Sequence, residues 1–198
     1  MATYQQSYLN SCGASCLLCG AYELGINQIP QNPRYILLQA GPTPLELTQA
    51  CETQIYQVTS NNPNNINPDG WSYSMPSQIV ICARMLGLTA WATAYRTWSV
   101  RGLKIGYNNE LNALRALNAL DEPGGSWWKS NRSFRNPIGD QRELRVLLER
   151  KHFGMHYVMI RPDGTVMEPG AGVDYGSIQA AKVAIDMHGT GLSVFIQR

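Results

Sequence analysis

The sequence predicts an α+β fold, in which an N-terminal helix packs on an antiparallel sheet formed late in the chain. Residues 12–24 are small and apolar nearly all round, which is typical of a buried helix, and the last part of the chain carries strand and hairpin patterns. The chain has 198 residues, of which 44% are apolar and 15% are charged, and this composition can bury one sizeable core. We therefore expect one domain spanning residues 1–198.

The first part of the chain predicts two helices and a loop. The helix at 12–24 stops at Gly25, because glycine readily takes the left-handed conformation that ends a helix. Thr43-Pro44-Leu45-Glu46 reads as a capping box with proline at the first helical position, and it predicts a second helix through about residue 56. The polar stretch 59–70, rich in Asn and Pro, predicts an exposed loop.

The middle of the chain predicts further helices around one strand. SMPSQIVICARMLGL predicts a helix that ends near Gly87, and the alternating LTAWATAY after it predicts a strand. Apolar residues at helical spacing predict two more helices, at 109–120 and 140–150. The segment 121–139 between them, which contains two adjacent tryptophans, predicts a loop.

The C-terminal part predicts a hairpin, a helix and a strand. HYVMI and TVME are two short strand patterns joined around Pro162-Asp163-Gly164, which favours a tight turn. A helix near 176–187 and a strand in LSVFIQ complete the chain. With a helix first and a sheet last, residues at the two ends of the chain meet only through the fold.

Charge and hydropathy exclude several classes of protein. The 16 basic and 14 acidic residues are scattered and leave a net charge of +2, so we expect no nucleic-acid partner. No apolar stretch reaches the roughly 18 to 20 residues of a membrane span, and MATYQQSYLN lacks the pattern of a Sec signal. We expect a cytoplasmic protein as encoded, without a membrane partner, and the sequence permits delivery into another cell by a specialised secretion system.

The five cysteines predict reduced thiols and not a disulfide framework, because their number is odd and a chain of this length needs no staples. Cys16 and Cys19 form C-x-x-C, but no second pair completes a four-ligand zinc site, so we expect neither a metal nor a cofactor. We interpret Cys16, Cys19, Cys51 and Cys82 as small buried hydrophobic residues.

Cys12 differs from the other cysteines because it is the first residue of the predicted helix. The positive end of the helix dipole and the unpaired N–H groups there stabilise a thiolate, which is what a nucleophile needs. Gln6, a side-chain amide six residues upstream, could bind an oxyanion together with the backbone N–H of Cys12. We expect Cys12 to be a nucleophile and Gln6 an oxyanion-hole residue.

His156 is the best candidate for the base that takes the thiol proton. It opens the first strand of the hairpin, and Glu168 ends the returning strand, so the two side chains lie near each other at the open end. Glu168 could therefore hold the imidazole in the required tautomer. Of the two other histidines, His152 has no matched acidic partner and His188 lies at a predicted helix end, where we expect it to be a cap.

Together these residues carry a family resemblance. Gln6 followed after five residues by Cys12-Gly13-Ala14 and an apolar helix, and far downstream His156-Tyr157-Val158 with Glu168-Pro169, resembles the papain-like cysteine peptidases. The nearest pattern is that of the bacterial peptidases that remove double-glycine leaders from bacteriocins. The resemblance implies a papain-like fold with Cys12 as nucleophile, His156 as base, Glu168 as orienting acid and Gln6 in the oxyanion hole. The chain departs from the pattern in carrying glutamate where aspartate is usual, and in a longer region between Gly87 and Lys151.

The resulting prediction is a cysteine peptidase that cleaves a protein or peptide substrate through a thioester. An amidase or glutamine deamidase of the same fold, acting as a toxin or effector, would use the same steps and stays an alternative. A non-catalytic binding domain with a buried thiol is a second alternative. The sequence does not indicate the oligomeric state, the substrate, or the roles of loops 59–70 and 121–139.

Overall fold

The computed structural model describes residues 1–94, 108–122, 136–149 and 154–198. Within them, the helices are α1 (Cys12–Glu23), α2 (Gln49–Thr59), α3 (Pro76–Met85), α5 (Asn108–Ala116) and α6 (Ile178–Ala184). Two short 3-10 helices are η1 (Ile36–Leu38) and η2 (Pro68–Gly70). The strands are β1 (Gln28–Ile29), β2 (Thr43–Pro44), β3 (Thr89–Ala94), β4 (Leu120–Asp121), β5 (Gln141–Glu149), β6 (Met155–Ile160), β7 (Val166–Glu168), β8 (Val173–Tyr175) and β9 (Met187–Gln197).

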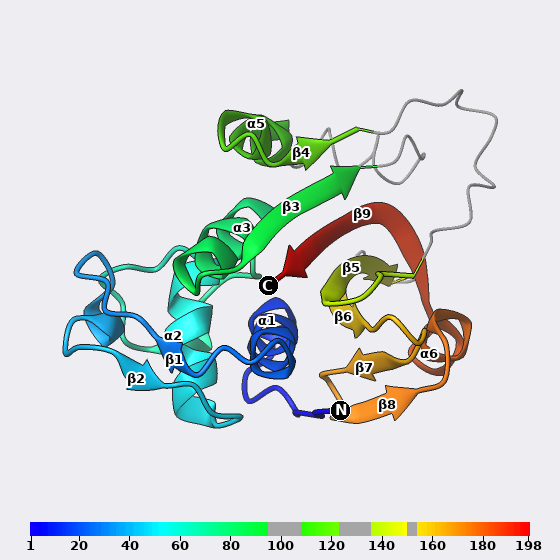
Figure 1. Cartoon of the computed structure of the whole chain (residues 1–198), viewed down its shortest axis with the longest axis horizontal. Coiled ribbons are helices and arrows are strands. Elements are labelled where there is room, and N and C mark those ends of the chain that lie inside the picture. Colours follow the sequence, from blue (N-terminus) through cyan, green and yellow to red (C-terminus); the bar gives the residue numbers. More distant parts are fainter. Residues whose placement is uncertain (95–107, 123–135, 150–153) are drawn as a thin grey trace.

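Helix α1 lies between the other N-terminal helices and the large sheet (Figure 1). Ten of its twelve residues, Cys12 to Ala21, are buried, as expected of a helix that is apolar on every side. It ends at Glu23, and Gly25 takes a left-handed conformation with φ of 75°, so the predicted helix and its C-cap are confirmed. The position of α1 explains why its sequence carries almost no polar face.

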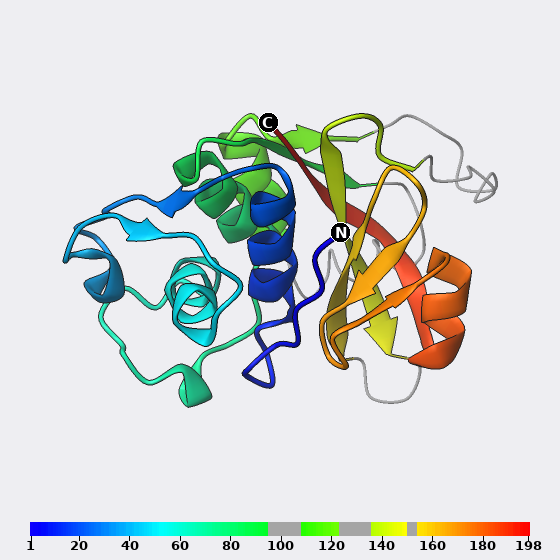
Figure 2. The ribbon, with the colours of Figure 1, turned by 60° about the horizontal axis from the view of Figure 1, so that its bottom comes forward.

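The described strands other than β1 and β2 form one sheet in the order β4-β3-β9-β5-β6-β7-β8. Apart from the parallel β3–β4 pair, neighbouring strands are antiparallel. The hydrophobic core joins α1, α2 and α3 to the inner face of this sheet, and α6 covers the outer face beside β7 and β8 (Figure 2). The predicted α+β class is confirmed, with the first helix packed on a sheet formed mainly by the later strands.

The predicted start of the second helix is wrong. Thr43 and Pro44 form strand β2, which pairs with Gln28 and Ile29, and α2 begins only at Gln49. Thr48 is the actual N-cap, because its side chain accepts a hydrogen bond from the backbone N–H of Cys51. The capping-box pattern therefore occurred a few residues before the threonine that caps the helix.

The segment predicted as a helix at 140–150 is strand β5. Its residues alternate: Leu144 and Val146 face the main core, whereas Glu143 and Arg145 lie on the other face, where their side chains form a buried ion pair at 2.7 Å. Pairing with both β6 and β9 overrides the helical spacing of the leucines. The adjacent polar residues Arg142 and Glu143 and the adjacent apolar residues Leu147 and Leu148 interrupt the alternation that marks a strand.

The C-terminal prediction is right in kind but wrong in extent. Helix α6 stops at Ala184, and β9 begins at Met187, earlier than the predicted strand, so His188 lies in β9 and is not a helix cap. Helix α5 also ends earlier than expected, at Ala116. The helix ending near Gly87, the strand that follows it and the hairpin are confirmed as α3, β3 and the β6–β7 pair.

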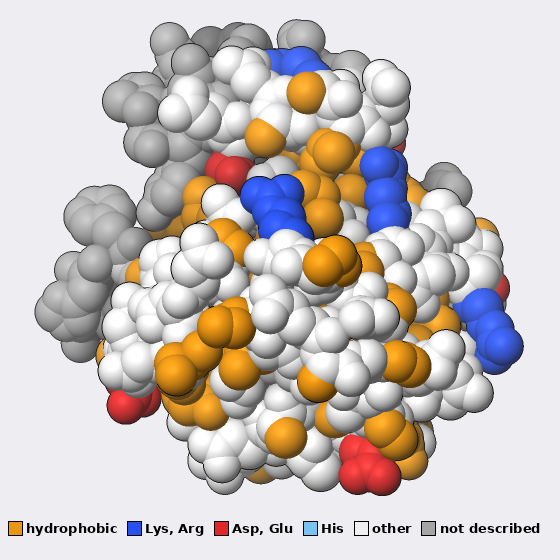
Figure 3. Space-filling model, turned by 90° about the vertical axis from the view of Figure 1, so that its left-hand side faces the viewer, with side chains coloured by type: hydrophobic (Ala, Val, Ile, Leu, Met, Phe, Trp, Pro, Cys, Tyr) orange, Lys and Arg blue, Asp and Glu red, His pale blue; other side chains and the backbone are white. Residues whose placement is uncertain are grey.

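No helix in the described ranges is long and apolar enough to cross a membrane. The predicted loop 59–70 is irregular and largely exposed between residues 60 and 67, whereas Thr59 is the last residue of α2 and Pro68–Gly70 form η2. The face that carries α2 and the small β1–β2 sheet shows few charged side chains, set apart by uncharged surface (Figure 3). Most of loop 121–139, including Trp127 and Trp128, lies outside the described residues, as does His152.

Candidate active site

Cys12 is the first residue of α1, as the sequence predicted, and its side chain is buried. The residue before it, Ser11, is the N-cap, but its side chain makes no capping hydrogen bond to the first turn. The first backbone N–H groups of a helix have no partner within the helix, and no side-chain cap from Ser11 occupies them here. The thiol therefore lies at the positive end of the helix dipole.

His156 and Glu168 lie side by side, on the paired strands β6 and β7. The register places Met159 opposite Met167 and Ile160 opposite Val166. The Nε2 atom of His156 is 2.7 Å from Oε1 of Glu168, and the two side chains are only 14% and 4% exposed. The predicted meeting of these two residues at the open end of the hairpin is therefore seen in the structure.

The Glu168 carboxylate is held by two backbone N–H groups in addition to the imidazole. Gly170 N–H donates to Oε1 at 2.6 Å, and Ala171 N–H donates to Oε2 at 2.8 Å. Burial raises the pKa of Glu168, but the hydrogen bonds from His156, Ala171 and Gly170 outweigh it and hold the pKa below its usual value. The carboxylate is thus ionised at neutral pH and stays aimed at His156.

Cys12 and Glu168 act together on the charge of His156. Burial lowers the pKa of the imidazole, whereas hydrogen bonds with Cys12 and Glu168, and the charges of both, raise it to about 9. Since Nε2 is taken by Glu168, Nδ1 is the ring nitrogen left for the thiol. The arrangement favours an imidazolium beside the sulfur at neutral pH, which is the form that stabilises a thiolate.

The N-terminal segment is tied to the loop that follows Glu168. The backbone N–H of Gln6 donates to the carbonyl of Pro169 at 2.8 Å, and Gln5 Nε2 donates to the carbonyl of Gly170 at 3.2 Å. A Cβ atom on Gly172 would lie 2.8 Å from Cβ of Gln5, so the two segments are in close contact. Gln6 is in this way fixed to the same loop that orients the Glu168 carboxylate.

The side chain of Gln6 is directed at its own loop. Its Nε2 donates to the carbonyl of Tyr8 at 2.7 Å and to that of Leu9 at 3.1 Å, and its buried Oε1 has no hydrogen-bond partner among the described residues. The structure therefore brings Gln6 close to the catalytic candidates through its backbone, while its amide is engaged by two carbonyls. The oxyanion-hole role stays a prediction.

A family model described as "Invasion plasmid antigen J, cysteine protease" matches residues 4–198. The chain belongs to this family. The protein named "Cysteine protease IpaJ" from Shigella flexneri is 31% identical over 175 residues, which cover 86% of this chain and 65% of that protein. The matched region thus spans less than two thirds of the length of that relative. No solved structure matches the chain.

The four other cysteines are free and buried, as predicted. Burial raises the pKa of Cys16 well above its ordinary value, with the charges of Cys12 and Cys19 adding to it. Burial likewise raises the pKa of Cys19 to about 12. Within the described ranges, no group of three or more His, Cys, Asp or Glu side chains is placed to hold a metal ion. Cys12 thus differs from these cysteines in position, since it lies at the helix start and acts on the pKa of His156.

Sequence reasoning missed Glu52, the fully buried carboxylate of helix α2 beside the start of α1. Its oxygens accept hydrogen bonds from Ser11 and Ser15, which flank Cys12 along the chain. In the sequence, QACETQ looks like an ordinary polar helix surface, and the predicted start of the helix was too early. A charged residue gives no local signal that it will be buried, so only tertiary contacts could reveal this one.

Proposed function

We propose that the chain is a cysteine peptidase in which Cys12 is the nucleophile, His156 the acid-base residue, Glu168 the orienting acid and Gln6 the oxyanion-hole residue. The observation that carries the proposal is the position of His156, whose ring is hydrogen-bonded to Glu168 at 2.7 Å and lies close enough to Cys12 for the thiol to raise its pKa. Membership of a family described as cysteine proteases supports the same reaction class. We treat residues 1–198 as one domain with a papain-like fold.

The mechanism begins with attack of the Cys12 thiolate on the carbonyl carbon of an amide. A carbon–sulfur bond forms, and the carbonyl electron pair moves to the oxygen of the tetrahedral intermediate. His156 then gives its proton to the leaving nitrogen, the carbon–nitrogen bond breaks, and a thioester remains. Water attacks the thioester while His156 accepts its proton, and the carbon–sulfur bond then breaks, which releases the acid product and restores the Cys12 thiolate beside the protonated His156.

To stabilise the oxyanion, the Gln6 amide must give up one of its hydrogen bonds to a backbone carbonyl and donate to the substrate oxygen instead. Of its two contacts, the one to Leu9 is longer and exposed, so it is the contact that substrate would replace, while the 2.7 Å bond to Tyr8 keeps the amide in place. The backbone N–H of Cys12 would be the second donor. Removing one such donor costs about 10²- to 10³-fold in rate in a serine peptidase.

The resemblance to double-glycine-leader peptidases concerns Gln6, Cys12 and His156, and we propose no leader specificity from it. The relative from Shigella flexneri and the family description, an invasion plasmid antigen, support delivery of this chain into another cell as an effector. An epitope-tagged chain expressed in Shigella flexneri should be recovered from the interior of infected cells by fractionation. Recovery from the bacteria alone contradicts this part of the proposal.

The reaction is tested with a library of peptides digested from a whole proteome. The wild-type chain should create new peptide termini, seen by mass spectrometry, and the Cys12→Ala and His156→Ala variants should create none. Cys19→Ala, which removes a buried thiol of the same helix, is the matched control and should stay active. A mass gain of about one dalton without cleavage would instead indicate the deamidase, and unchanged peptides together with unreactive Cys12 would indicate a binding domain.

A further inference from the structure

Glu52 is a buried carboxylate that has no cationic partner among the described residues. Its exposed fraction is 0%, although it lies in the first turn of α2, where most glutamates of small proteins face solvent. Burying an ionised carboxylate costs several kcal/mol unless its oxygens are satisfied. We therefore expect Glu52 to make contacts that an apolar side chain of the same size could not make.

Every described hydrogen-bond partner of Glu52 is a neutral donor, and all of them belong to the segment that leads into and begins α1. The Ser7 backbone N–H donates to both carboxylate oxygens at 3.0 Å, and the Tyr4 hydroxyl donates at 2.8 Å. The hydroxyls of Ser11 and Ser15 donate at 2.6 and 2.8 Å. Only a group with two acceptor oxygens and no hydrogen of its own can bind all of these donors at once.

The contact with Ser11 changes how α1 begins. An N-cap serine normally turns its hydroxyl toward the N–H groups of the first helical turn, but Ser11 makes no such bond and its closest partner is Glu52. Glu52 therefore keeps the hydroxyl away from the helix start beside Cys12, together with the backbone of Tyr8, whose N–H donates to the same hydroxyl at 3.3 Å. The backbone N–H groups there stay available for a substrate oxygen that becomes negatively charged.

The same carboxylate also holds the loop between the two residues that bind the oxyanion in our proposal. Ser7 follows Gln6 directly, and Ser11 precedes Cys12 directly, so the loop is fixed at both ends by one side chain. Tyr8 and Leu9, whose carbonyls accept from Gln6, lie between these two anchors. A shift of this loop would move both oxyanion donors relative to each other.

We propose that Glu52 is a positioning residue, which fixes the loop from Ser7 to Ser11 so that the Gln6 amide and the Cys12 backbone N–H face the same substrate oxygen. The inference rests on the proposed function, because it assigns a role to a residue outside the triad. Glu52 touches neither substrate nor the reacting atoms. Its effect should appear in steps that form an oxyanion and be small in steps that do not.

The test compares two reactions of Cys12 in the full chain. Acylation by p-nitrophenyl N-carbobenzoxyglycinate passes through a tetrahedral oxyanion, whereas alkylation by iodoacetamide displaces iodide directly and forms none. Both rates are measured at neutral pH for the wild type, Glu52→Gln, Ser11→Ala and Glu23→Gln, and rates of Cys12→Ala are subtracted. Glu23→Gln is the matched control, because Glu23 is a buried carboxylate at the C-terminal end of α1, far from Cys12 at its N-terminal end.

Glu52→Gln keeps the side-chain volume but turns an amide N–H₂ toward groups that are themselves donors. We expect its acylation rate to fall at least tenfold and its alkylation rate to change less than about threefold, since misplacing reacting groups by about 1 Å can cost 10²-fold. Ser11→Ala should show the same split to a smaller degree, and it keeps the measurement possible if Glu52→Gln does not fold. Glu23→Gln should lower the thermal midpoint and leave both rates per folded molecule within about twofold.

Parallel falls in acylation and alkylation, or no fall in either, would overturn the role of Glu52 while leaving the triad intact. If wild type and Cys12→Ala acylate equally, the proposed function fails, and the inference fails with it. An equal split in Glu23→Gln would also overturn it, because the effect would then follow from destabilising α1 at either end.

Discussion

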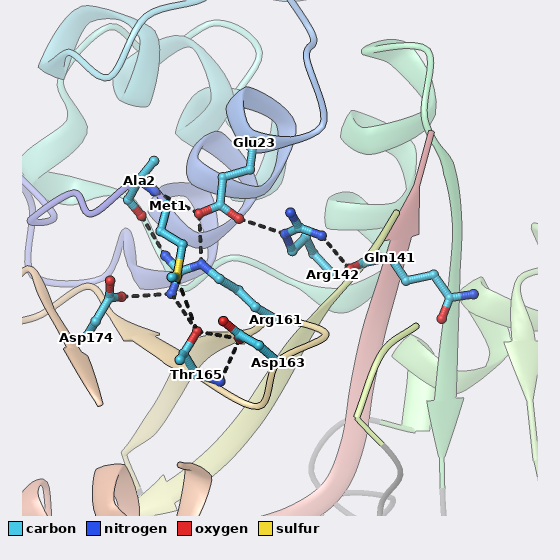
Figure 4. A network of polar contacts seen from close by, with 9 residues as sticks. All are labelled: Met1, Ala2, Glu23, Gln141, Arg142, Arg161, Asp163, Thr165 and Asp174. Carbon is cyan, nitrogen blue, oxygen red and sulfur yellow. Dashed lines mark hydrogen bonds and ion pairs between the residues drawn. The ribbon is translucent and has the colours of Figure 1, made fainter. Parts of the chain in front are cut away.

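A buried carboxylate lies at each end of helix α1, but one is bound by cations and the other by neutral donors. At the C-terminal end, Glu23 forms ion pairs with Arg142 at 2.7 Å and with Arg161 at 2.8 Å, and it accepts from the backbone N–H of Ala2 (Figure 4). At the N-terminal end, Glu52 is bound by neutral donors alone in the described part of the chain.

The ion pairs around Glu23 hold the fold together, whereas the end of α1 that carries Cys12 can act on a substrate. Arg161, only 2% exposed, also binds Asp174 and the carbonyl of Ala2, so its charge is fully paired and holds the N-terminal segment against the sheet (Figure 4). Pairing of this kind leaves no charge to act on a substrate. At the other end, the helix dipole and the imidazole beside Cys12 are not neutralised by a close ion pair with Glu52, and they remain able to stabilise a developing negative charge.

The largest effect should come from breaking the pair that orients the histidine. Glu168→Gln removes the charge that raises the pKa of His156, so the alkaline limb of the acylation rate, expected near pH 9 in the wild type, should move to lower pH. An amide at this position also favours the wrong tautomer, and the rate at pH 7 should fall about 10³- to 10⁴-fold. Rates measured between pH 5 and 10 would check both, and an unmoved alkaline limb contradicts the assignment of Glu168.

Removing Arg161 at the C-terminal end of α1 should lower the free energy of unfolding and leave the reaction rate of Cys12 unchanged. Arg161→Met leaves Glu23 with one ion pair and Asp174 with no partner at this position, and breaking a buried pair typically costs about 3 to 5 kcal/mol. Urea titration should show this loss, whereas alkylation of Cys12 per folded molecule should stay near the wild-type rate. Arg115→Met, which breaks an exposed ion pair with Glu122, is the control and should cost less than about 1 kcal/mol.

The smallest effect should come from crowding the carboxylate without removing it. A Cβ atom on Gly170 would lie 2.8 Å from Oε1 of Glu168, the oxygen that faces His156. Overpacking of this size typically costs about 1 to 3 kcal/mol, and we expect Gly170→Ala to slow acylation about tenfold. Gly70→Ala, where nothing lies within 4 Å, is the control. Equal rates in the two variants would show that the Glu168 position tolerates displacement.

The pH dependence of stability should have two limits, one from each member of the His156–Glu168 pair. Because the folded pKa of His156 is raised to about 9, its contribution to stability is complete below the unfolded value of about 6.5 and is lost as the pH rises through 9. The lowered pKa of Glu168 acts in the opposite range, and its contribution is lost as the pH falls below about 4. In a His156→Gln variant, unfolding measured between pH 7 and 10 should lose the alkaline decline.

Local patterns were sufficient where a short stretch of chain decides its own conformation. The apolar run after Cys12 with glycine at its end, and the turn between two short strands, predicted α1 and the hairpin that carries His156 and Glu168. Their meeting followed from hairpin geometry, since the two residues lie on adjacent strands. The four candidate residues could therefore be named from the sequence, and their catalytic roles stay a proposal.

Other features were decided only by contacts between distant segments. Residues 141–149 have leucines at helical spacing, yet they form a strand, because their backbone pairs with β6 on one side and β9 on the other, and Glu143 can neutralise Arg145 on the outer face. Glu52 looked like a surface residue until α2 packed against the start of α1. Sequence by itself determined which residues could do chemistry, while tertiary structure decided which charges are paired and which are left to act, because burial and pairing depend on neighbours far along the chain.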